Sequence, residues 1–419
     1  MSSPAANTFG TPDNDVGTLN GFFKETYADK LENLIPDGVK MINKIPFLPK
    51  DKQPGNLYHQ PVILGLEHGV TFANSTDDAF NLMPAIAGTT KDAEVRGNPL
   101  VLRSVLGYTA ASRAAQGTAK AFEDGTKFLV ANMLRSVTKK LEIELMYGQI
   151  GYATVASGGG TTVLNITTSE WAPGIWAGAE QMPIEIRSAN GAVSRGTSSV
   201  FSVDFLNQAI TTVSIIPGVI AGDVIWHKGA YGNEFPGIHY ILSITSGTLF
   251  NINVGQYTLF RGNQFDCQAA ALSFTKIVQA TERAVEKGLD GKALALVNPR
   301  GWTNMMSDQA ALRRYDGSYS KAIGENGMEV IKFHSVNGEI EIESSVYVKQ
   351  GYAYILALDE WMRVGSSDVT FKRPSQGEEF FRDLQDAAGY ELRLWSDQAL
   401  FCQAPGRNCL MFDIVNSSS

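Results

Sequence analysis

Cysteine is scarce in this chain, with Cys267, Cys402 and Cys409 among 419 residues. An odd number of cysteines without paired spacing argues against a disulfide framework of the kind that stabilises small secreted domains. Cys402 and Cys409 could meet across a hairpin, but we expect them to be buried free thiols instead. The cysteines therefore predict reduced thiols in a protein that is made in the cytoplasm.

Histidine is equally scarce, and none of the five histidines lies at metal-ligand spacing from another candidate ligand. Catalytic motifs are lacking too, since the sequence has no Gly-x-Ser-x-Gly elbow. Gly291-Lys292 resembles the end of a phosphate loop, but Ala293 replaces the hydroxyl that would hold magnesium. We predict no catalytic residues, no cofactor and no bound metal, and we expect exposed or hydrogen-bonded histidines, including His59 and His68.

Runs of basic residues and long apolar runs are also absent. The net charge is −8, whereas a groove that binds nucleic acid gains its affinity from a basic patch. The charge and the lack of basic runs therefore argue against a groove that binds nucleic acid tightly. The most apolar stretch, residues 210–226, is interrupted by Pro217 and Asp223, and it is too short to cross a bilayer. The N-terminus lacks a basic region followed by an apolar run, so we expect no signal peptide.

What the chain does contain is glycine, at 41 residues, and 44% hydrophobic residues, which suits strands and turns around sizeable cores. Its length predicts about two to three domains of ~150 residues. Residues 1–55 predict an arm, with a short helical pattern that includes Phe22 and Phe23 and ends at Pro36. The apolar residues of this arm are buried either on its own domain or across a neighbouring subunit, and the pattern alone leaves both alternatives open.

Two strand-like runs, 58–66 and 99–108, predict a long two-stranded hairpin over residues 56–110, with Lys91 at its tip. An isolated hairpin is marginally stable, so this projection is expected to need a partner. Residues 118–147 then carry an apolar stripe at helical spacing, which predicts a helix ~45 Å long. Gly148 is a plausible stop for this helix.

Residues 150–265 predict a β-rich block with a short helix near 171–181. The pair Trp171 and Trp176 could line a sugar-binding face, but core packing is the stronger interpretation. Strands are expected at 184–186, 199–203, 211–216, 223–227, 240–244 and 249–254. Further on, the pattern predicts a helix–strand unit over 271–300, a helix after Trp302, a strand over 340–348 with 352–358 as its neighbour, and a long strand over 390–395.

Four segments carry a family resemblance, and their order along the chain is unusual. They are the helix end Glu144–Gly148, the phrase Ala295–Trp302, the stretch from Gly338 to Arg363, and the tail from Gly389 to Pro405. Together with the arm, hairpin and long helix, they resemble the major capsid proteins of tailed bacteriophages, the Hong Kong 97-type fold. The resemblance covers nearly the whole chain. Each motif alone is a weak signal, and the order of the whole set is fairly specific.

The resemblance implies an α+β fold with an N-terminal arm, an extended β-hairpin (the E-loop), a spine helix, a P-domain and an A-domain with a β-rich insertion. The implied boundaries are 1–55 for the arm, 56–110 for the E-loop, 111–149 for the spine helix of the P-domain, 150–365 for the A-domain, 366–398 for the P-domain strands and 399–419 for the return to the A-domain. The insertion is placed near 184–255. No N-terminal scaffolding segment is recognised, so a separate scaffold is expected.

The function implied is that of a non-enzymatic shell protein, which self-assembles into hexamers and pentamers of an icosahedral head around double-stranded DNA. It would assemble in the host cytoplasm with scaffolding, portal and decoration proteins. The candidate inter-subunit contacts are Phe22, Phe23, Lys91, Arg96 and Arg103, with both arginines expected to meet acidic groups of a neighbour. The alternatives are an encapsulin-like compartment of the same fold, a β-rich glycan-binding protein or glycoside hydrolase, and a phage tail or decoration protein.

Overall fold

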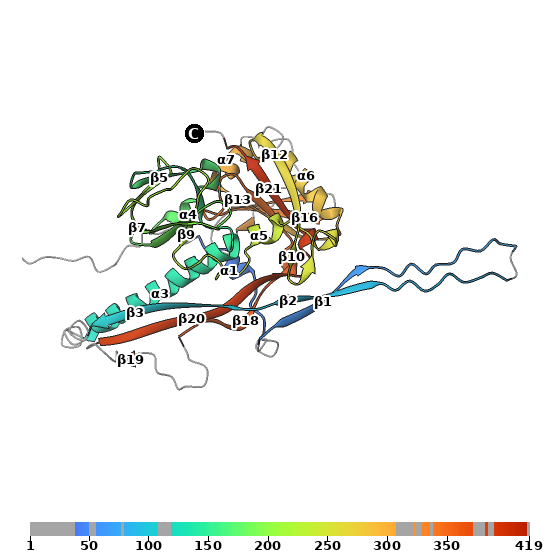
Figure 1. The fold of residues 1–419 in the computed structure, drawn as a ribbon, viewed down its shortest axis with the longest axis horizontal. Coiled ribbons are helices and arrows are strands. Elements are labelled where there is room, and N and C mark those ends of the chain that lie inside the picture. Colours follow the sequence, from blue (N-terminus) through green and yellow to red (C-terminus); the bar gives the residue numbers. More distant parts are fainter. Residues whose placement is uncertain are drawn as a thin grey trace, which may run out of the picture. The chain divides into compact units, whose positions relative to one another are not determined.

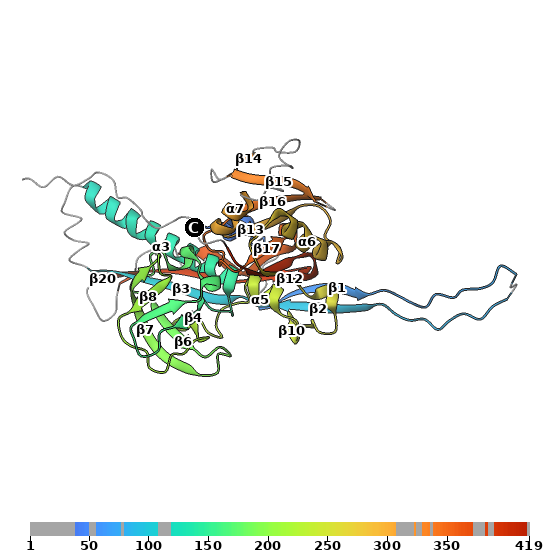
Figure 2. The ribbon, with the colours of Figure 1, turned by 90° about the horizontal axis from the view of Figure 1, so that it is seen from above.

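The structure is a computed structural model, and it describes residues 38–49, 56–76, 79–107, 119–306, 322–323, 329–335, 338–371, 382–383 and 389–416. The chain divides into two compact units, residues 1–36 and 37–419, and the first lies outside the described residues. All helices and strands in Figures 1 and 2 belong to the second unit. No helix in the described ranges is long and apolar enough to cross a membrane.

A mixed seven-stranded sheet lies at the core of the second unit, in the order β12-β21-β17-β13-β16-β15-β14. Its strands are β12 (Asn263–Ala270), β13 (Ala293–Val297), β14 (Ala322–Ile323), β15 (Glu329–Ser335), β16 (Gly338–Ser344), β17 (Ala353–Leu356) and β21 (Cys409–Ile414). The prediction that the runs 340–348 and 352–358 are neighbours is wrong, because β13 lies between β16 and β17. Every residue of β13 is apolar and buried, which suits the centre of a sheet covered on both faces.

Two hydrophobic clusters cover the two faces of this sheet. Leu294 and Leu296 of β13 belong to one cluster, and Ala293, Ala295 and Val297 belong to the other. Helix α6 (Phe274–Val285) packs on the second face against β12, β17 and β21. The predicted helix–strand unit is therefore confirmed, while α7 (Pro299–Met306) begins before the predicted position.

A second sheet is built around the long strand β20 (Gly389–Cys402), which pairs with β18 (Trp361–Thr370), β19 (Arg382–Asp383) and β3 (Asn98–Gly107). The pairing of β3 with β20 runs from Asn98 opposite Gln398 to Gly107 opposite Gly389. The run 99–108 is therefore not the second side of the hairpin, as the sequence predicted. Its partner is almost three hundred residues away along the chain, and strand periodicity does not reveal that kind of pairing.

The hairpin is formed instead by β1 (Tyr58–Gly65) and β2 (Thr89–Val95), in an antiparallel register that sets Tyr58 opposite Val95 and Val62 opposite Lys91. Strand β2 carries few apolar residues, and it was not predicted for that reason. The chain between the two strands continues as two segments that run side by side in both views (Figures 1 and 2).

Helix α3 (Ala119–Tyr147) confirms the predicted long helix, and its apolar residues from Met133 onwards are buried, except for Leu134, which is exposed. Its end is fixed by a close approach: a Cβ atom on Gly148 would lie 2.1 Å from the carbonyl oxygen of Phe235. Only glycine fits there, which supports the predicted stop. Helix α1 (Met41–Lys44) packs against α3.

A closed barrel with the strand order β4-β5-β8-β7-β6-β9 accounts for most of the β-rich block. Its strands are β4 (Ala153–Ser157), β5 (Val163–Ile166), β6 (Pro183–Arg187), β7 (Ser194–Asp204), β8 (Ala209–Thr212) and β9 (Val224–His227). Ile184, Val200 and Ile225 are fully buried in it. Trp171 precedes α4 (Pro173–Trp176), and Trp176 is the last residue of that helix. Both side chains are buried, and their rings stack with centroids 6.3 Å apart, so the predicted core packing is confirmed.

The strand predicted at 240–244 is wrong, because α5 (Ile238–Ser243) is a helix. Ile238, Ile241 and Leu242 are buried at helical spacing, and a short apolar run of this kind fits either structure until its packing is known. The other short elements are η2 (Thr168–Glu170), β10 (Thr248–Leu249), β11 (Ile252–Asn253), η3 (Thr258–Phe260), η4 (Leu358–Glu360) and η5 (Pro405–Arg407). All three cysteines are free and buried, as predicted.

Candidate assembly surfaces

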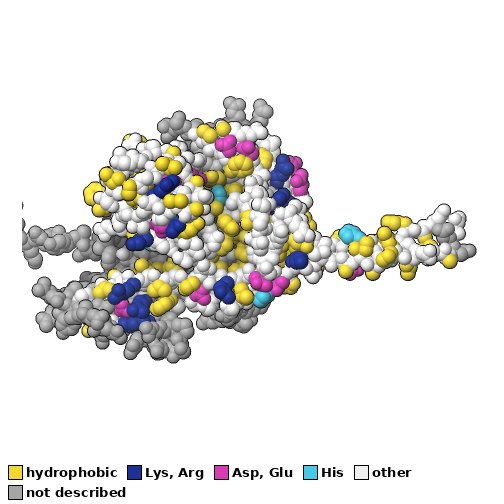
Figure 3. Space-filling view, viewed as in Figure 1, with side chains coloured by type: hydrophobic (Ala, Val, Ile, Leu, Met, Phe, Trp, Pro, Cys, Tyr) yellow, Lys and Arg dark blue, Asp and Glu magenta, His cyan; other side chains and the backbone are white. Residues whose placement is uncertain are grey.

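The residues between β1 and β2, numbers 66–88, form a segment that we call the hairpin extension. It carries apolar side chains that the second unit does not cover: Leu66, Val70, Phe72, Phe80, Leu82, Met83 and Ile86 are exposed. Phe72 is 91% exposed and Leu82 is 78% exposed. Figure 3 shows these hydrophobic side chains along the extension. Because exposed apolar surface is a common feature of interaction sites, the extension is a candidate assembly surface.

The root of the hairpin is held firmly, in contrast to the extension. Ala93 and Val95 of β2 are buried, and the ring of Tyr58 meets the ring of Phe401 edge-on, with centroids 5.8 Å apart. The backbone N–H of Glu94 donates a hydrogen bond to the carbonyl of Phe250 (3.1 Å). Across the extension itself, His68 N donates to Ile86 O (3.1 Å). The extension is thus anchored at one end, and its described residues, 66–76 and 79–88, form no buried cluster of their own.

The candidate contact residues have different surroundings. Lys91 is exposed on β2 and not at the hairpin tip, so that prediction is wrong. Arg96 is exposed between β2 and β3. Arg103 Nε donates a hydrogen bond to Glu391 Oε2 (2.6 Å), so it already has an acidic partner in its own chain. Phe22 and Phe23 lie outside the described residues.

Residues 38–49, which we call the strap, are the described part of the predicted arm, and they pack on their own unit. Met41 and Ile45 are fully buried. The strap is also tied to β18, since Leu48 N donates to Arg363 O (2.9 Å) and Arg363 N donates to Pro46 O (2.8 Å). Of the two alternatives for the arm, this part follows the first, a strap across its own domain.

A buried carboxylate on α3 fixes the strap. Glu142 accepts hydrogen bonds from the backbone N–H groups of Lys40 (2.9 Å), Met41 (2.9 Å) and Ile42 (3.0 Å). These groups begin α1, where helical N–H donors need outside acceptors. Burial raises the pKa of Glu142, although the three hydrogen bonds oppose that shift. Sequence reasoning missed this role, and its only signal was a glutamate among the apolar residues of a helix.

A second acid, Glu170, lines an open pocket of about 520 Å³ beside Trp226 and Tyr231. Its carboxylate accepts hydrogen bonds from Lys349 Nζ (2.5 Å) and Tyr352 Oη (2.8 Å). Burial alone would raise the pKa of Glu170, but the charge of Lys349 and these hydrogen bonds hold the pKa below its ordinary value. A carboxylate that is ionised and fully paired in this way is poorly suited to general acid–base chemistry.

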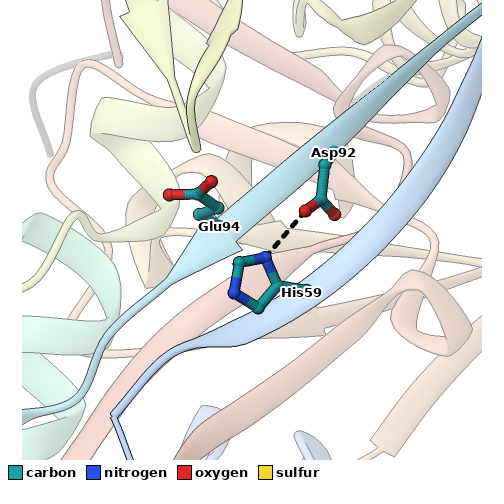
Figure 4. Close-up of side chains that lie close together, drawn as sticks. All are labelled: His59, Asp92 and Glu94. Carbon is teal, nitrogen blue, oxygen red and sulfur yellow. Dashed lines mark hydrogen bonds and ion pairs between the residues drawn. The ribbon is translucent and has the colours of Figure 1, made fainter.

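The structure brings together one group of potential metal ligands that the sequence did not predict. His59 on β1 and Asp92 and Glu94 on β2 lie on one face of the hairpin root (Figure 4). His59 Nδ1 lies 2.7 Å from Asp92 Oδ2. The prediction that His59 is exposed or hydrogen-bonded is confirmed, but its acidic partners are distant in sequence and join it only through strand pairing.

Comparison with known proteins gives structural matches only, because no family model and no curated protein matches the sequence. A chain of the cyanophage A-1(L) capsid asymmetric unit superposes with a TM-score of 0.56 at 11% identity, covering 96% of this chain and 100% of that chain. The capsid of cyanophage P-SCSP1u gives a TM-score of 0.48 at 8% identity, covering 99% of each chain. The SrpI encapsulin of Synechococcus elongatus PCC 7942 gives 0.46 at 9% identity, covering 98% of this chain and 99% of that chain.

The first of these matches defines the class of fold. A full-length superposition at such low identity shows shared architecture and nothing about partners. The chain has the Hong Kong 97-type capsid fold, a mixed α and β architecture, as the sequence resemblance implied.

Proposed function

We propose that this chain is the major capsid protein of a tailed phage, a structural protein that builds an icosahedral shell from copies of itself. The observation that carries this proposal is the hairpin extension. Its apolar side chains are exposed in a single chain, and the fold of that chain is the capsid fold. An apolar surface that its own chain leaves uncovered is stabilised when a second molecule covers it.

In this account the extension acts as the E-loop and lies over a neighbouring subunit. Phe72 and Leu82 would be buried there, and Arg96 would meet an acidic group of the neighbour. Arg103 plays a smaller part than the sequence suggested, because Glu391 already binds it. Closed point-group symmetry repeats one such contact around the shell, so a modest contact becomes a stable assembly.

The finer parts of the proposal concern contents and location. We propose hexamers and pentamers around double-stranded DNA that the wall contacts weakly, and assembly in a host cytoplasm with scaffolding and portal proteins. The net charge of −8 supports weak contact, since strong phosphate binding needs many cations. The barrel would be an insertion in the A-domain, and the 29-residue α3 would be the spine helix of the shell wall.

Sedimentation and electron microscopy of the full-length chain, produced with the genes of its own genome, test this proposal. We expect closed shells of uniform size that protect DNA from nuclease. Closed shells that contain protein cargo and no protected DNA would favour the encapsulin-like alternative instead. A chain that stays monomeric with and without its neighbouring gene products would contradict a shell function, and it would reopen the glycan-binding alternative.

A further inference from the structure

The root of the hairpin brings three potential metal ligands together on one face of a two-stranded ribbon. His59 on β1 lies directly opposite Glu94 on β2, and Asp92 is two residues before Glu94. Side chains two residues apart on a strand point to the same face, so the strand register alone converges these groups. Figure 4 shows the imidazole of His59 facing the carboxylate of Asp92, with the side chain of Glu94 next to them on the same face.

The distances are suited to a shared ion. One ligand atom from each of the three residues lies within 4.8 Å of the other two. His59 Nδ1 and Asp92 Oδ2 are already 2.7 Å apart, and both side chains are about half exposed, at 50% and 47%. An ion could therefore enter from solvent, and small rotations of the side chains would bring the ligand atoms to coordination distance.

One of the three ligands is held in place by a separate segment. Asn251 Nδ2 donates a hydrogen bond to Glu94 Oε1 (3.1 Å), and the backbone N–H of Glu94 donates a hydrogen bond to the carbonyl of Phe250. Partners of this kind orient a ligand and raise the affinity of a metal site. The other oxygen of Glu94 can coordinate while Oε1 keeps its hydrogen bond.

We propose that His59, Asp92 and Glu94 form a binding site for a divalent first-row transition ion, with Zn²⁺ as the ion that fits best. Imidazole nitrogen suits Zn²⁺, whereas Mg²⁺ and Ca²⁺ prefer oxygen ligands throughout. The ion would replace the hydrogen bond between His59 and Asp92. Neutral His59 would offer the lone pair of Nδ1, the two carboxylates would balance the charge of the ion, and water would complete the coordination.

Such an ion would tie β1 to β2 where the hairpin leaves the body of the protein, and through Asn251 it would also tie the hairpin to the loop at residues 250–251. The root of the hairpin would become stiffer and the register of β1 and β2 more stable. This site is independent of the proposed shell function, because all its ligands come from one chain.

Titration of the metal-free, unassembled full-length chain with Zn²⁺ tests the site, with binding measured by isothermal titration calorimetry. Titration with Co²⁺, measured by its absorbance, provides a second readout of the same site. We expect one ion per chain, and affinity at least ~10-fold weaker in His59→Ala and in Asp92→Asn. His68→Ala is the matched control, because His68 is also an exposed histidine of the hairpin, and its binding should be unchanged. All of these substitutions are at exposed positions, so the fold should survive.

Two results would overturn the site. One is the absence of saturable Zn²⁺ binding by the wild-type chain. The other is binding that His59→Ala leaves intact, which would place the ion elsewhere and leave His59 and Asp92 as a hydrogen-bonded pair only. Hydrogen exchange gives an independent readout: Zn²⁺ should slow exchange in β1 and β2 of the wild type and of His68→Ala, but not of His59→Ala.

Discussion

The seven-stranded sheet and the hairpin extension are both extended and rich in apolar side chains, yet these side chains are buried in the sheet and exposed in the extension. Every residue of β13 is buried between two hydrophobic clusters of its own chain. Most apolar residues of the extension are exposed, and Phe72 is almost entirely so. A hydrophobic pattern therefore predicts that a strand will be covered, but not which molecule covers it.

The largest effect should come from removing the apolar surface of the extension. In the double variant Phe72→Ser and Leu82→Ser we expect shells to be lost, because the contact with the neighbour loses its buried area. The single chain should keep its stability within about 0.5 kcal/mol, since both residues are exposed there. Sedimentation velocity measures the first effect, and urea unfolding measures the second.

Phe201→Ser is a matched control, because Phe201 is an apolar residue of β7 that is 68% exposed. It should leave shell formation intact. Normal shells from the double variant would show that the extension is not an assembly surface.

The sheet should respond in the opposite way. Leu296→Ala removes a fully buried side chain from the central strand, and it should lower the free energy of unfolding by about 2 to 5 kcal/mol. Urea unfolding of the single chain measures this loss. A stability equal to that of the wild type would contradict the central place of β13 in the core.

The strap is attached to its own unit through the hydrogen bonds of a single polar side chain, that of Glu142. Glu142→Ala would leave three backbone N–H groups without their acceptor and should cost about 3 kcal/mol. Limited proteolysis should then cut within residues 38–49. Glu142→Gln keeps one carbonyl acceptor and should lose less, so equal losses in the two variants would argue against the hydrogen-bond explanation.

The smallest effect is a pH dependence inside the body of the protein. Burial, with the charge of Glu234, raises the pKa of Glu144 from 4.5 to about 8. The folded chain therefore holds a proton that the unfolded chain releases, and its stability should fall as the pH rises from 4.5 to about 8. Glu144→Gln removes that dependence and can still accept the hydrogen bond from Phe235 N.

We expect the variant to gain about 1 to 3 kcal/mol over the wild type between pH 5 and pH 8, measured by urea unfolding. Lys140, whose pKa burial lowers to about 7, is present in both proteins and cancels in the comparison. Identical pH profiles would show that Glu144 is ionised in the folded chain.

How much the sequence could predict follows from how local each signal is. The helix α3 and the strands β13 and β20 have long or continuous apolar patterns, and all three were predicted. The pairing of β3 with β20, the helical state of α5 and the position of β13 between β16 and β17 depend on contacts between distant segments, so periodicity could not supply them.

The candidate sites follow the same rule. The hairpin was expected to need a partner, but the sequence pattern did not identify the exposed apolar side chains between its strands, such as Phe72 and Leu82. His59 is 33 residues from Asp92 along the chain, so only the register of β1 and β2 brings them together. The hydrogen bonds between Glu142 and the strap likewise join groups about a hundred residues apart in the sequence.

The most direct test of the central claim is a cryo-electron microscopy map of the assembled particle, read at the hairpin extension. The account predicts that residues 66–88 lie on a neighbouring subunit, with Phe72 and Leu82 buried in that contact. A map in which the extension folds back on its own subunit, or stays exposed to solvent in a closed shell, would contradict it.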